Sequence, residues 1–142
     1  MATPMTDATW RAFLSEGTRT AKVATTRADG RPHVAPVWFL LDGDHLVFNT
    51  DRNTVKGRTL IRDGRVALCV DDDRPPFSFV AVNGRAEVSE DPTQVREWAA
   101  RIAVRYVGQH RATEYAARNS APGILLVRMS IDKVVALSGV AD

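Results

Sequence analysis

Two cations stand where the sequence predicts the start of a short helix. Asn53 is a favoured N-cap residue, and Lys56 and Arg58 follow it closely. This end of a helix carries partial positive charge and normally attracts Asp or Glu, so two cations here favour an anionic ligand. Residues 45–49 are predicted to form a strand that leads into the helix, and free N–H groups beside cations bind phosphate. The alternative interpretation is a solvated basic face on a short helix.

Gly57 lies between these two cations. A glycine inside a helix costs about 1 kcal/mol relative to alanine, which favours a position where a ligand or a backbone segment must approach closely. The helix is expected to end at Asp63 and Gly64, because glycine can adopt the left-handed conformation that stops a helix.

The motifs of self-contained catalytic mechanisms are missing from the sequence. It contains no Gly-x-Gly-x-x-Gly, Walker A, His-Glu-x-x-His or Gly-x-Ser-x-Gly pattern. His33, His45 and His110 are far apart in the chain, so we expect no metal site. Cys69 is predicted to be a small apolar residue of a buried strand. Since no catalytic residue is assigned, an enzyme of this sequence would take its reactivity from a bound organic cofactor.

Length and composition indicate one globular domain over residues 1–142. The chain has 44% hydrophobic and 25% charged residues and a formal net charge of +2. This charge is too small and too dispersed to favour nucleic acid as a partner. The sequence has neither an apolar run of membrane-spanning length nor a signal peptide, so we expect no membrane association and a cytoplasmic location.

A hairpin is expected before the cationic helix, with strands over residues 19–26 and 32–41. The second strand is apolar on both alternating faces from Val34 onward, so both faces need cover. In a chain this small, the second cover is expected to be another copy of the protein. Val34, Val37 and Phe39 are the positions expected at that interface, while Pro36 marks an interruption of the hydrogen-bond ladder.

The rest of the chain is predicted to alternate between strands and flanking helices. Strands in hairpin order with helices at the edges favour an antiparallel Greek-key barrel over a doubly wound parallel sheet. The further expected elements are a helix from Thr6 or Asp7 to Gly17, a strand over 65–71, a strand over 77–88 with a bend or bulge at Asn83 and Gly84, a helix beginning at Asp91 and Pro92 with Val95, Trp98, Ile102 and Tyr106 on its buried face, a short helix over 111–118, and the last strand or strands within 123–137.

Three segments, in this order and spacing, resemble a known group of proteins. They are residues 24–38 (ATTRADGRPHVAPVW), Asn49 with Thr50, and residues 56–66 (KGRTLIRDGRV). Over nearly its whole length the chain resembles the flavin and deazaflavin split-barrel proteins of the pyridoxamine-phosphate-oxidase-like superfamily. It is most similar to the small actinobacterial enzymes that use the deazaflavin coenzyme F420. The resemblance implies a mainly β (α+β), six-stranded antiparallel Greek-key split barrel with flanking helices, and an isologous homodimer with the cofactor in a groove between subunits.

The resemblance also implies which residues meet the cofactor. The implied cofactor-binding residues are Lys56 at the phosphate with Thr54, Gly57 and Arg58 beside it, Pro36, Val37 and Trp38 along the ring system, Asn49 and Thr50 at the ribityl-type chain, and Phe77, Ser78 and Phe79 on a neighbouring strand that closes the site.

Two departures from the family pattern narrow the expected activity. The C-terminus lacks the basic motif with which pyridoxamine phosphate oxidases grip their substrate, so vitamin B6 oxidation is not implied. Thr54 stands where several F420 enzymes have Arg. The leading hypothesis is an F420-dependent reductase that transfers a hydride to a conjugated small molecule, with Arg52, Arg58 and Arg62 near the oligoglutamate tail. The alternatives are an FMN-dependent oxidase or reductase, a cofactor-binding protein without turnover, and a structural dimer with an empty groove.

Overall fold

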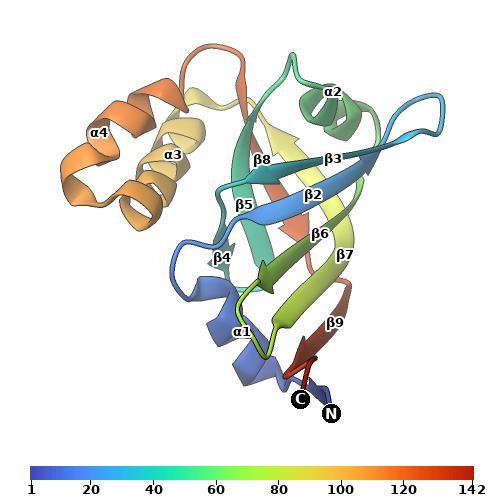
Figure 1. The fold of residues 1–142 in the computed structure, drawn as a ribbon. Coiled ribbons are helices and arrows are strands. Elements are labelled where there is room, and N and C mark those ends of the chain that lie inside the picture. Colours follow the sequence, from blue (N-terminus) through green and yellow to red (C-terminus); the bar gives the residue numbers. More distant parts are fainter.

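Antiparallel strands curl into a half-barrel in the computed structural model, which describes residues 1–142, and helices lie around it (Figure 1). The strands are β1 (Thr3–Pro4), β2 (Ala21–Thr26), β3 (Pro32–Val37), β4 (Leu40–Asp42), β5 (His45–Asp51), β6 (Arg65–Asp72), β7 (Ser78–Ser89), β8 (Ile124–Ser130) and β9 (Lys133–Ser138). The helices are α1 (Asp7–Ser15), α2 (Val55–Arg62), α3 (Pro92–Val107) and α4 (Gln109–Arg118). None of the four helices has the length and apolar composition that a membrane crossing requires.

The sheet confirms the antiparallel half-barrel, but the expected number of six strands is wrong. Its strand order is β3-β2-β6-β7-β8-β5-β4, with β9 paired to β7 and β1 paired to β9, which makes nine strands. The strand expected over 32–41 is divided at Trp38 and Phe39 into β3, which pairs with β2, and β4, which pairs with β5. The chain therefore passes from one edge of the sheet to the other within these two residues.

Strand β7 holds the two halves of the sheet together. Its first part pairs with β9 over Phe79–Asn83, and its last part pairs with β8 from Ala86 onward. Its register with β6 is continuous past this point, so the feature expected at Asn83 and Gly84 is a bend and not a bulge. A Cβ on Gly84 would lie 1.8 Å from the carbonyl oxygen of Ser130, which explains why a glycine stands at the bend.

The helix starts follow local hydrogen bonds. The Asp91 side chain accepts from the N–H of Thr93 and caps α3, as the sequence predicts. The expected cap of α2 is wrong by one residue: Thr54 is the N-cap, because its hydroxyl accepts from the N–H of Gly57. The N–H of Asn53 is instead bound by the carboxylate of Asp51.

The main core fills the concave side of the sheet. Helix α1 closes one end of the half-barrel with its buried residues Trp10, Phe13 and Leu14. Val37 and Phe39 also belong to this core, with 8% and 0% of their surface exposed. The expectation that both lie at a subunit interface is therefore wrong, because their own chain already covers them.

Helix α3 covers a different part of the sheet. Its residues Val95 and Trp98 pack with Val47 of β5 and Leu126 of β8 in a second, smaller core. Helix α4 packs against α3, so the pair stands as a wall on one side of the half-barrel (Figure 1).

Candidate functional site

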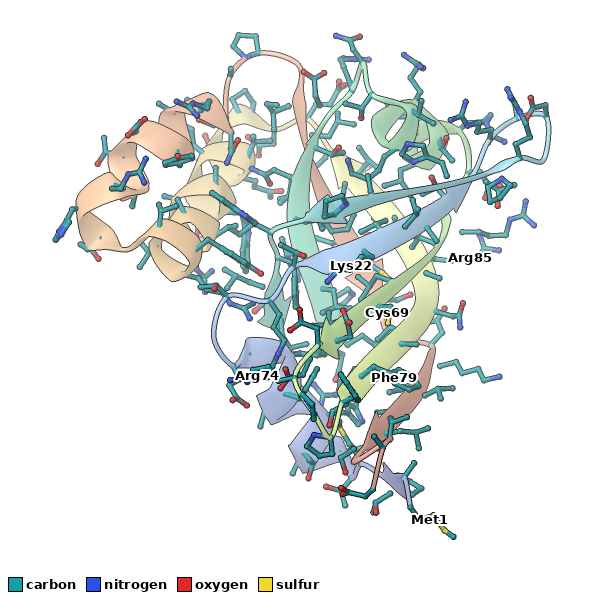
Figure 2. All side chains as sticks on the ribbon, viewed as in Figure 1. Met1, Lys22, Cys69, Arg74, Phe79 and Arg85 are labelled. Carbon is teal, nitrogen blue, oxygen red and sulfur yellow. The ribbon has the colours of Figure 1, made fainter.

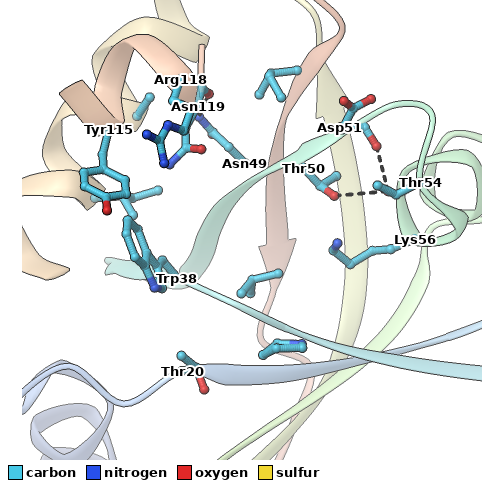
Figure 3. Close-up of a pocket in the computed structure, with 15 residues that line it drawn as sticks. Thr20, Trp38, Asn49, Thr50, Asp51, Thr54, Lys56, Tyr115, Arg118 and Asn119 are labelled. Atoms are coloured by element: carbon cyan, nitrogen blue, oxygen red, sulfur yellow. Dashed lines mark hydrogen bonds between the residues drawn. The ribbon is translucent and has the colours of Figure 1, made fainter. Parts of the chain in front are cut away.

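A cavity of about 500 Å³ opens between the half-barrel and the α3–α4 wall (Figure 3). Strands β3 and β5, the start of α2, and helices α3 and α4 all contribute to its lining. The lining residues are Thr20, Pro36, Val37, Trp38, Asn49, Thr50, Asp51, Thr54, Lys56, Ala99, Ile102, Tyr115, Arg118, Asn119 and Ile124.

The cavity brings together seven of the twelve residues that the sequence assigns to the cofactor. They come from segments that are separate in the chain and meet only through the β3–β4 break, strand β5 and the start of α2. The seven residues are Pro36, Val37, Trp38, Asn49, Thr50, Thr54 and Lys56.

Lys56 is the most unusual residue of this lining. It is only 8% exposed, and its ammonium group makes no hydrogen bond or ion pair with the protein. Burial without a partner lowers the pKa of Lys56 from its ordinary value, because the charged form loses water. The hydroxyls of Thr50 and Thr54 lie 3.5 Å apart on the same side of the cavity (Figure 3). An anion at this place would provide the partner that Lys56 lacks.

Asn49 links the half-barrel to the helical wall. Its side-chain amide donates to the carbonyl oxygens of Val95, at 3.3 Å, and Asn119, at 3.0 Å. Its Oδ1 atom is buried and accepts no hydrogen bond. A buried acceptor without a donor is costly, so this atom also suits a ligand that brings an N–H or O–H group.

The sequence does not identify the residues that α4 and its C-terminal end contribute. Tyr115, Arg118 and Asn119 face the cavity (Figure 3). Ala112 is the only buried residue of α4, so the helix has no apolar stripe from which a buried or ligand-facing side is evident. Its position depends on packing against α3, which the sequence of α4 alone does not encode.

Gly57 is one of five assigned residues that lie outside the cavity. A Cβ at this position would lie 2.2 Å from the carbonyl oxygen of Asp51. The close approach of a backbone segment, one of the two reasons expected for this glycine, is therefore confirmed, and Gly57 does not line the cavity.

Arg58 lies on the exposed side of α2, where its guanidinium donates to the carbonyl oxygen of Asn53 at 2.6 Å. It borders a second hollow between α2 and the β2–β3 turn, of about 420 Å³. Arg27, Arg31 and Arg62 line the same hollow, in which Asp29 is the only acidic side chain. We call this set of four arginines the arginine hollow.

Arg52 does not join the other two arginines expected at the tail. Its guanidinium pairs with the carboxylate of Glu90. Arg62 lines the arginine hollow and donates to the carbonyl oxygen of Thr26 at 2.6 Å. The expected grouping of Arg52 with Arg58 and Arg62 is therefore wrong, and the two that stay together are Arg58 and Arg62.

The segment of Phe77, Ser78 and Phe79 also lies away from the cavity, at the start of β7. The hydroxyl of Ser78 accepts from the N–H of Gly139, and Phe79 pairs with Leu137 of β9. Figure 2 shows Phe79 near β9, at the end of the sheet opposite α2. Within one chain, this segment does not close the site.

The potential metal ligands of the chain are dispersed. No group of three or more His, Cys, Asp or Glu side chains gathers anywhere in the chain. Cys69 is half-buried and not fully buried as expected, and burial raises the pKa of its thiol.

Comparison with known proteins identifies the family. The family profile for pyridoxamine 5'-phosphate oxidase matches residues 6–138. The chain belongs to this family. As a member of the pyridoxamine 5'-phosphate oxidase family, it has the split-barrel fold that the resemblance predicts, and the cavity described above lies within the matched region.

Solved structures show the same fold at low sequence identity. A conserved hypothetical protein from Mycobacterium tuberculosis has 22% identity, covers 95% of this chain and 86% of its own, and gives a TM-score of 0.82. An F420 reductase has 26% identity, with 87% of this chain and 94% of its own covered and a TM-score of 0.73. An FAD-binding protein from Mesorhizobium loti has 18% identity, with 96% and 97% covered and a TM-score of 0.71. No curated protein matches the chain.

Proposed function

We propose that the protein is a coenzyme F420-dependent reductase that binds the deazaflavin in the cavity and reduces a conjugated small molecule there. The observation that carries this proposal is Lys56, a lysine of low exposure whose ammonium group has no partner in the protein and which lines a cavity together with other residues that the resemblance assigns to the cofactor. The F420 reductase of similar structure supports the choice of deazaflavin.

The cavity fits such a cofactor in size and in chemistry. Its volume of about 500 Å³ lies within the usual range for small-molecule sites. Lys56 would hold the phosphate, and the free Oδ1 of Asn49 would accept a hydrogen bond from the cofactor. Pro36 and Val37 of β3 supply apolar surface for the ring system.

The bound cofactor would supply hydride chemistry, and the chain's own residues would orient the reactants and exclude water. Ala99 and Ile102 of α3 are buried, and together with Val37 they give this part of the lining an apolar character. We assign no side chain as a proton donor, because a reduced substrate can take its proton from water.

The arginine hollow supports F420 over FMN. The cofactor F420 carries a carboxylate-rich tail beyond its phosphate, whereas FMN ends at the phosphate. The hollow and the cavity both border helix α2. Val55, Arg58 and Thr59 of this helix line the hollow, and Lys56 lines the cavity. Four arginines with one aspartate form a surface that suits a tail of carboxylates.

The test is a parallel titration of the purified protein with F420, FMN and the tail-less deazaflavin, followed by hydride transfer from the reduced form of whichever binds. We expect F420 to bind most tightly. Tighter binding of FMN at every salt concentration would transfer the assignment to an FMN-dependent oxidase or reductase. Tight F420 binding without turnover of any conjugated acceptor would favour a cofactor-binding protein.

A further inference from the structure

Trp38 contacts two aromatic rings, and the two rings are held in different ways. The ring of Tyr106 lies parallel to it, with an interplanar angle of 3° and centroids 5.1 Å apart. The ring of Tyr115 is tilted by 50°, with centroids 5.5 Å apart. Only the first arrangement is a face-to-face stack.

Tyr106 is fixed from both sides by the backbone. Its hydroxyl donates to the carbonyl oxygen of Arg19, at 2.8 Å, and accepts from the N–H of Phe39, at 3.2 Å. Burial raises the pKa of Tyr106, so the hydroxyl remains a donor at neutral pH. The neighbouring Arg105 donates to the carbonyl oxygen of Phe39 at 2.8 Å. Since Phe39 directly follows Trp38, these bonds also hold Trp38 in place.

Arg105 also connects this hydrogen-bond network to α1. Its guanidinium donates to the carbonyl oxygens of Leu14 and Gly17, at 2.8 and 3.0 Å, and it has no carboxylate partner. A half-buried guanidinium that donates to three carbonyl oxygens joins α1, α3 and the β3–β4 break into one rigid support. The Tyr106 face of Trp38 therefore does not open without breaking this network.

Tyr115 is held much more weakly. Its hydroxyl accepts one hydrogen bond, at 3.0 Å, from Arg111 on its own helix. Helix α4 begins after Gly108, which has a positive φ of 80° and gives the helix no side-chain cap, and it buries only Ala112. Moving Tyr115 off Trp38 therefore breaks few contacts with the rest of the protein.

We propose that the side of Trp38 that Tyr115 now contacts is the place where the protein binds the planar ring of an anionic, conjugated substrate, such as an aromatic carboxylate, and that Tyr115 moves away from Trp38 when the ligand binds. The position is separate from the phosphate end of the cavity at Lys56. The naming of this ligand as the hydride acceptor rests on the proposed function, whereas its binding to Trp38 does not need the deazaflavin.

The two arginines beside Tyr115 favour a negatively charged ligand. The guanidinium carbons of Arg111 and Arg118 lie 5.0 and 4.9 Å from the centre of the Tyr115 ring. Arg118 also lines the cavity. Glu114 pairs with Arg118 at 3.2 Å and is the only carboxylate that faces these two arginines. A ring that replaces Tyr115 would thus lie beside two cations, which favour a carboxylate on it.

The two tyrosines should have opposite effects on such a ligand. The contact between an aromatic pair is worth about a two- to tenfold change in affinity. A ligand that displaces Tyr115 must break the Trp38–Tyr115 contact, so its affinity is reduced by about this factor. Replacement Tyr115→Ala removes the competitor and should tighten binding by about two- to tenfold. Replacement Tyr106→Leu removes the stack and both hydrogen bonds that hold the platform, and should weaken binding by about tenfold or more.

The experiment uses 4-nitrobenzoate, a planar anion that quenches indole fluorescence, without any cofactor. The chain has three tryptophans, so the variants Trp10→Phe and Trp98→Phe together leave Trp38 as the only reporter. Calorimetric titration of the same tyrosine variants with all three tryptophans present gives the affinity independently of that background. Thermal unfolding identifies any variant that does not fold, and the Tyr115→Ala result tests the proposal by itself.

One control separates ring stacking from charge, and a second tests whether any substitution on α4 changes the affinity. Cyclohexanecarboxylate has the same charge but no planar ring, and its weaker binding should respond to neither tyrosine. His110→Ala changes an exposed residue of α4 and should leave the affinity for 4-nitrobenzoate unchanged.

Unchanged or weaker binding of 4-nitrobenzoate by Tyr115→Ala would overturn the proposal, because Tyr115 would then be part of the site and not its occupant. Equal effects on both carboxylates would also overturn it. If 4-nitrobenzoate behaves as expected while F420 does not bind, the proposed function fails and this inference stands.

Discussion

Lys56 is the residue at which ligand binding and stability oppose each other. The residue is largely buried and its ammonium group has no partner in the protein, so loss of water lowers the pKa of Lys56 and costs folding free energy. Locally unfavourable residues of this kind are expected at functional sites and are compensated elsewhere in the structure. In the protein without ligand, Lys56 should therefore reduce stability, and in the complex it should contribute to affinity.

Replacement Lys56→Met tests both effects. Met has a similar length and no charge, so the ligand-free protein should unfold at a higher temperature than the wild type. The same change should weaken F420 binding by about 1.5 to 3 kcal/mol, the range of a charge-assisted hydrogen bond. Thermal unfolding and titration measure the two effects. Arg96→Met, at an exposed residue of α3 outside the cavity, is the matched control and should change neither. Unchanged cofactor affinity in Lys56→Met would contradict the assignment of the phosphate site.

The pH dependence of stability provides a second test at Lys56. Its pKa is lower in the folded state than the ordinary value of about 10.5, so the unfolded chain binds more protons between the two values. The free energy of unfolding should therefore rise as pH increases through this alkaline range. In Lys56→Met that contribution is lost, so the difference in stability between the two proteins should shrink as the pH rises from 7 to 10. A constant difference across this range would show that the pKa of Lys56 is not lowered.

The arginine hollow makes a prediction about salt. Exposed ion pairs are screened, so F420 affinity should fall more steeply with added salt than the affinity for the tail-less deazaflavin. The double replacement Arg58→Gln and Arg62→Gln should remove this additional salt dependence. Arg52→Gln is the matched control, because Arg52 already pairs with Glu90 and lies outside the hollow. An effect of Arg52→Gln equal to that of the double replacement would contradict the placement of the tail.

At the scale of elements, the sequence predicts what short-range patterns determine. The Asp91 cap of α3 and the β2–β3 hairpin follow from adjacent residues and are confirmed. The break between β3 and β4 does not follow from adjacent residues. At this break the N–H and carbonyl groups of Phe39 are hydrogen-bonded by Tyr106 and Arg105, which lie more than sixty positions further along the chain.

The same distinction applies to the candidate site. Lys56 was identifiable because a cation at a helix start is locally unusual. Tyr115, Arg118 and Asn119 were not, because they reach the cavity only through the packing of α4 on α3. The assigned Phe77, Ser78 and Phe79 do not reach it within one chain, and no pattern along the sequence distinguishes a contact within one chain from a contact between two copies.

Gly57 gives a test at the level of helix α2. Helix propensity alone predicts that Gly57→Ala stabilises the protein by about 1 kcal/mol. The carbonyl oxygen of Asp51 would lie 2.2 Å from the new Cβ, so we expect a loss of about 1 to 3 kcal/mol instead. Denaturant unfolding of the ligand-free protein measures the sign. Arg58→Ala, on the exposed side of the same helix, is the control and should change stability by less than about 0.5 kcal/mol.

At the scale of the whole molecule, the outer face of the sheet lacks a cover. Strand β3 forms its edge, and the strand register aligns residues in rows across the outward side, most of them small or apolar. Figure 2 shows Lys22, Cys69 and Phe79 on neighbouring strands of this sheet. The two rows are Val34, Ala24, Ala67, Asn83 and Lys133, and Pro36, Lys22, Cys69, Ala81 and Val135.

We propose that a second copy of the chain covers this face. Val34 and Val135 are apolar and 65% and 45% exposed, and the ammonium group of Lys22 on the same face is paired with Asp71. Exposed apolar residues grouped on one face favour contact with a partner. A second copy also gives Phe77, Ser78 and Phe79 a route to a cavity, because they do not reach the cavity of their own chain.

The dimer is tested by sedimentation velocity of the wild type at low concentration, where we expect a single dimeric species. Val34→Lys places a charge at the most exposed apolar residue of the proposed interface and should shift the protein toward monomer. If the cofactor site needs both copies, the same variant should also bind F420 more weakly although Lys56 is intact. Val104→Lys, at an exposed apolar residue of α3 outside this face, is the matched control and should remain dimeric. A soluble wild-type monomer that binds F420 would contradict both the interface and the contribution of a second subunit to the site.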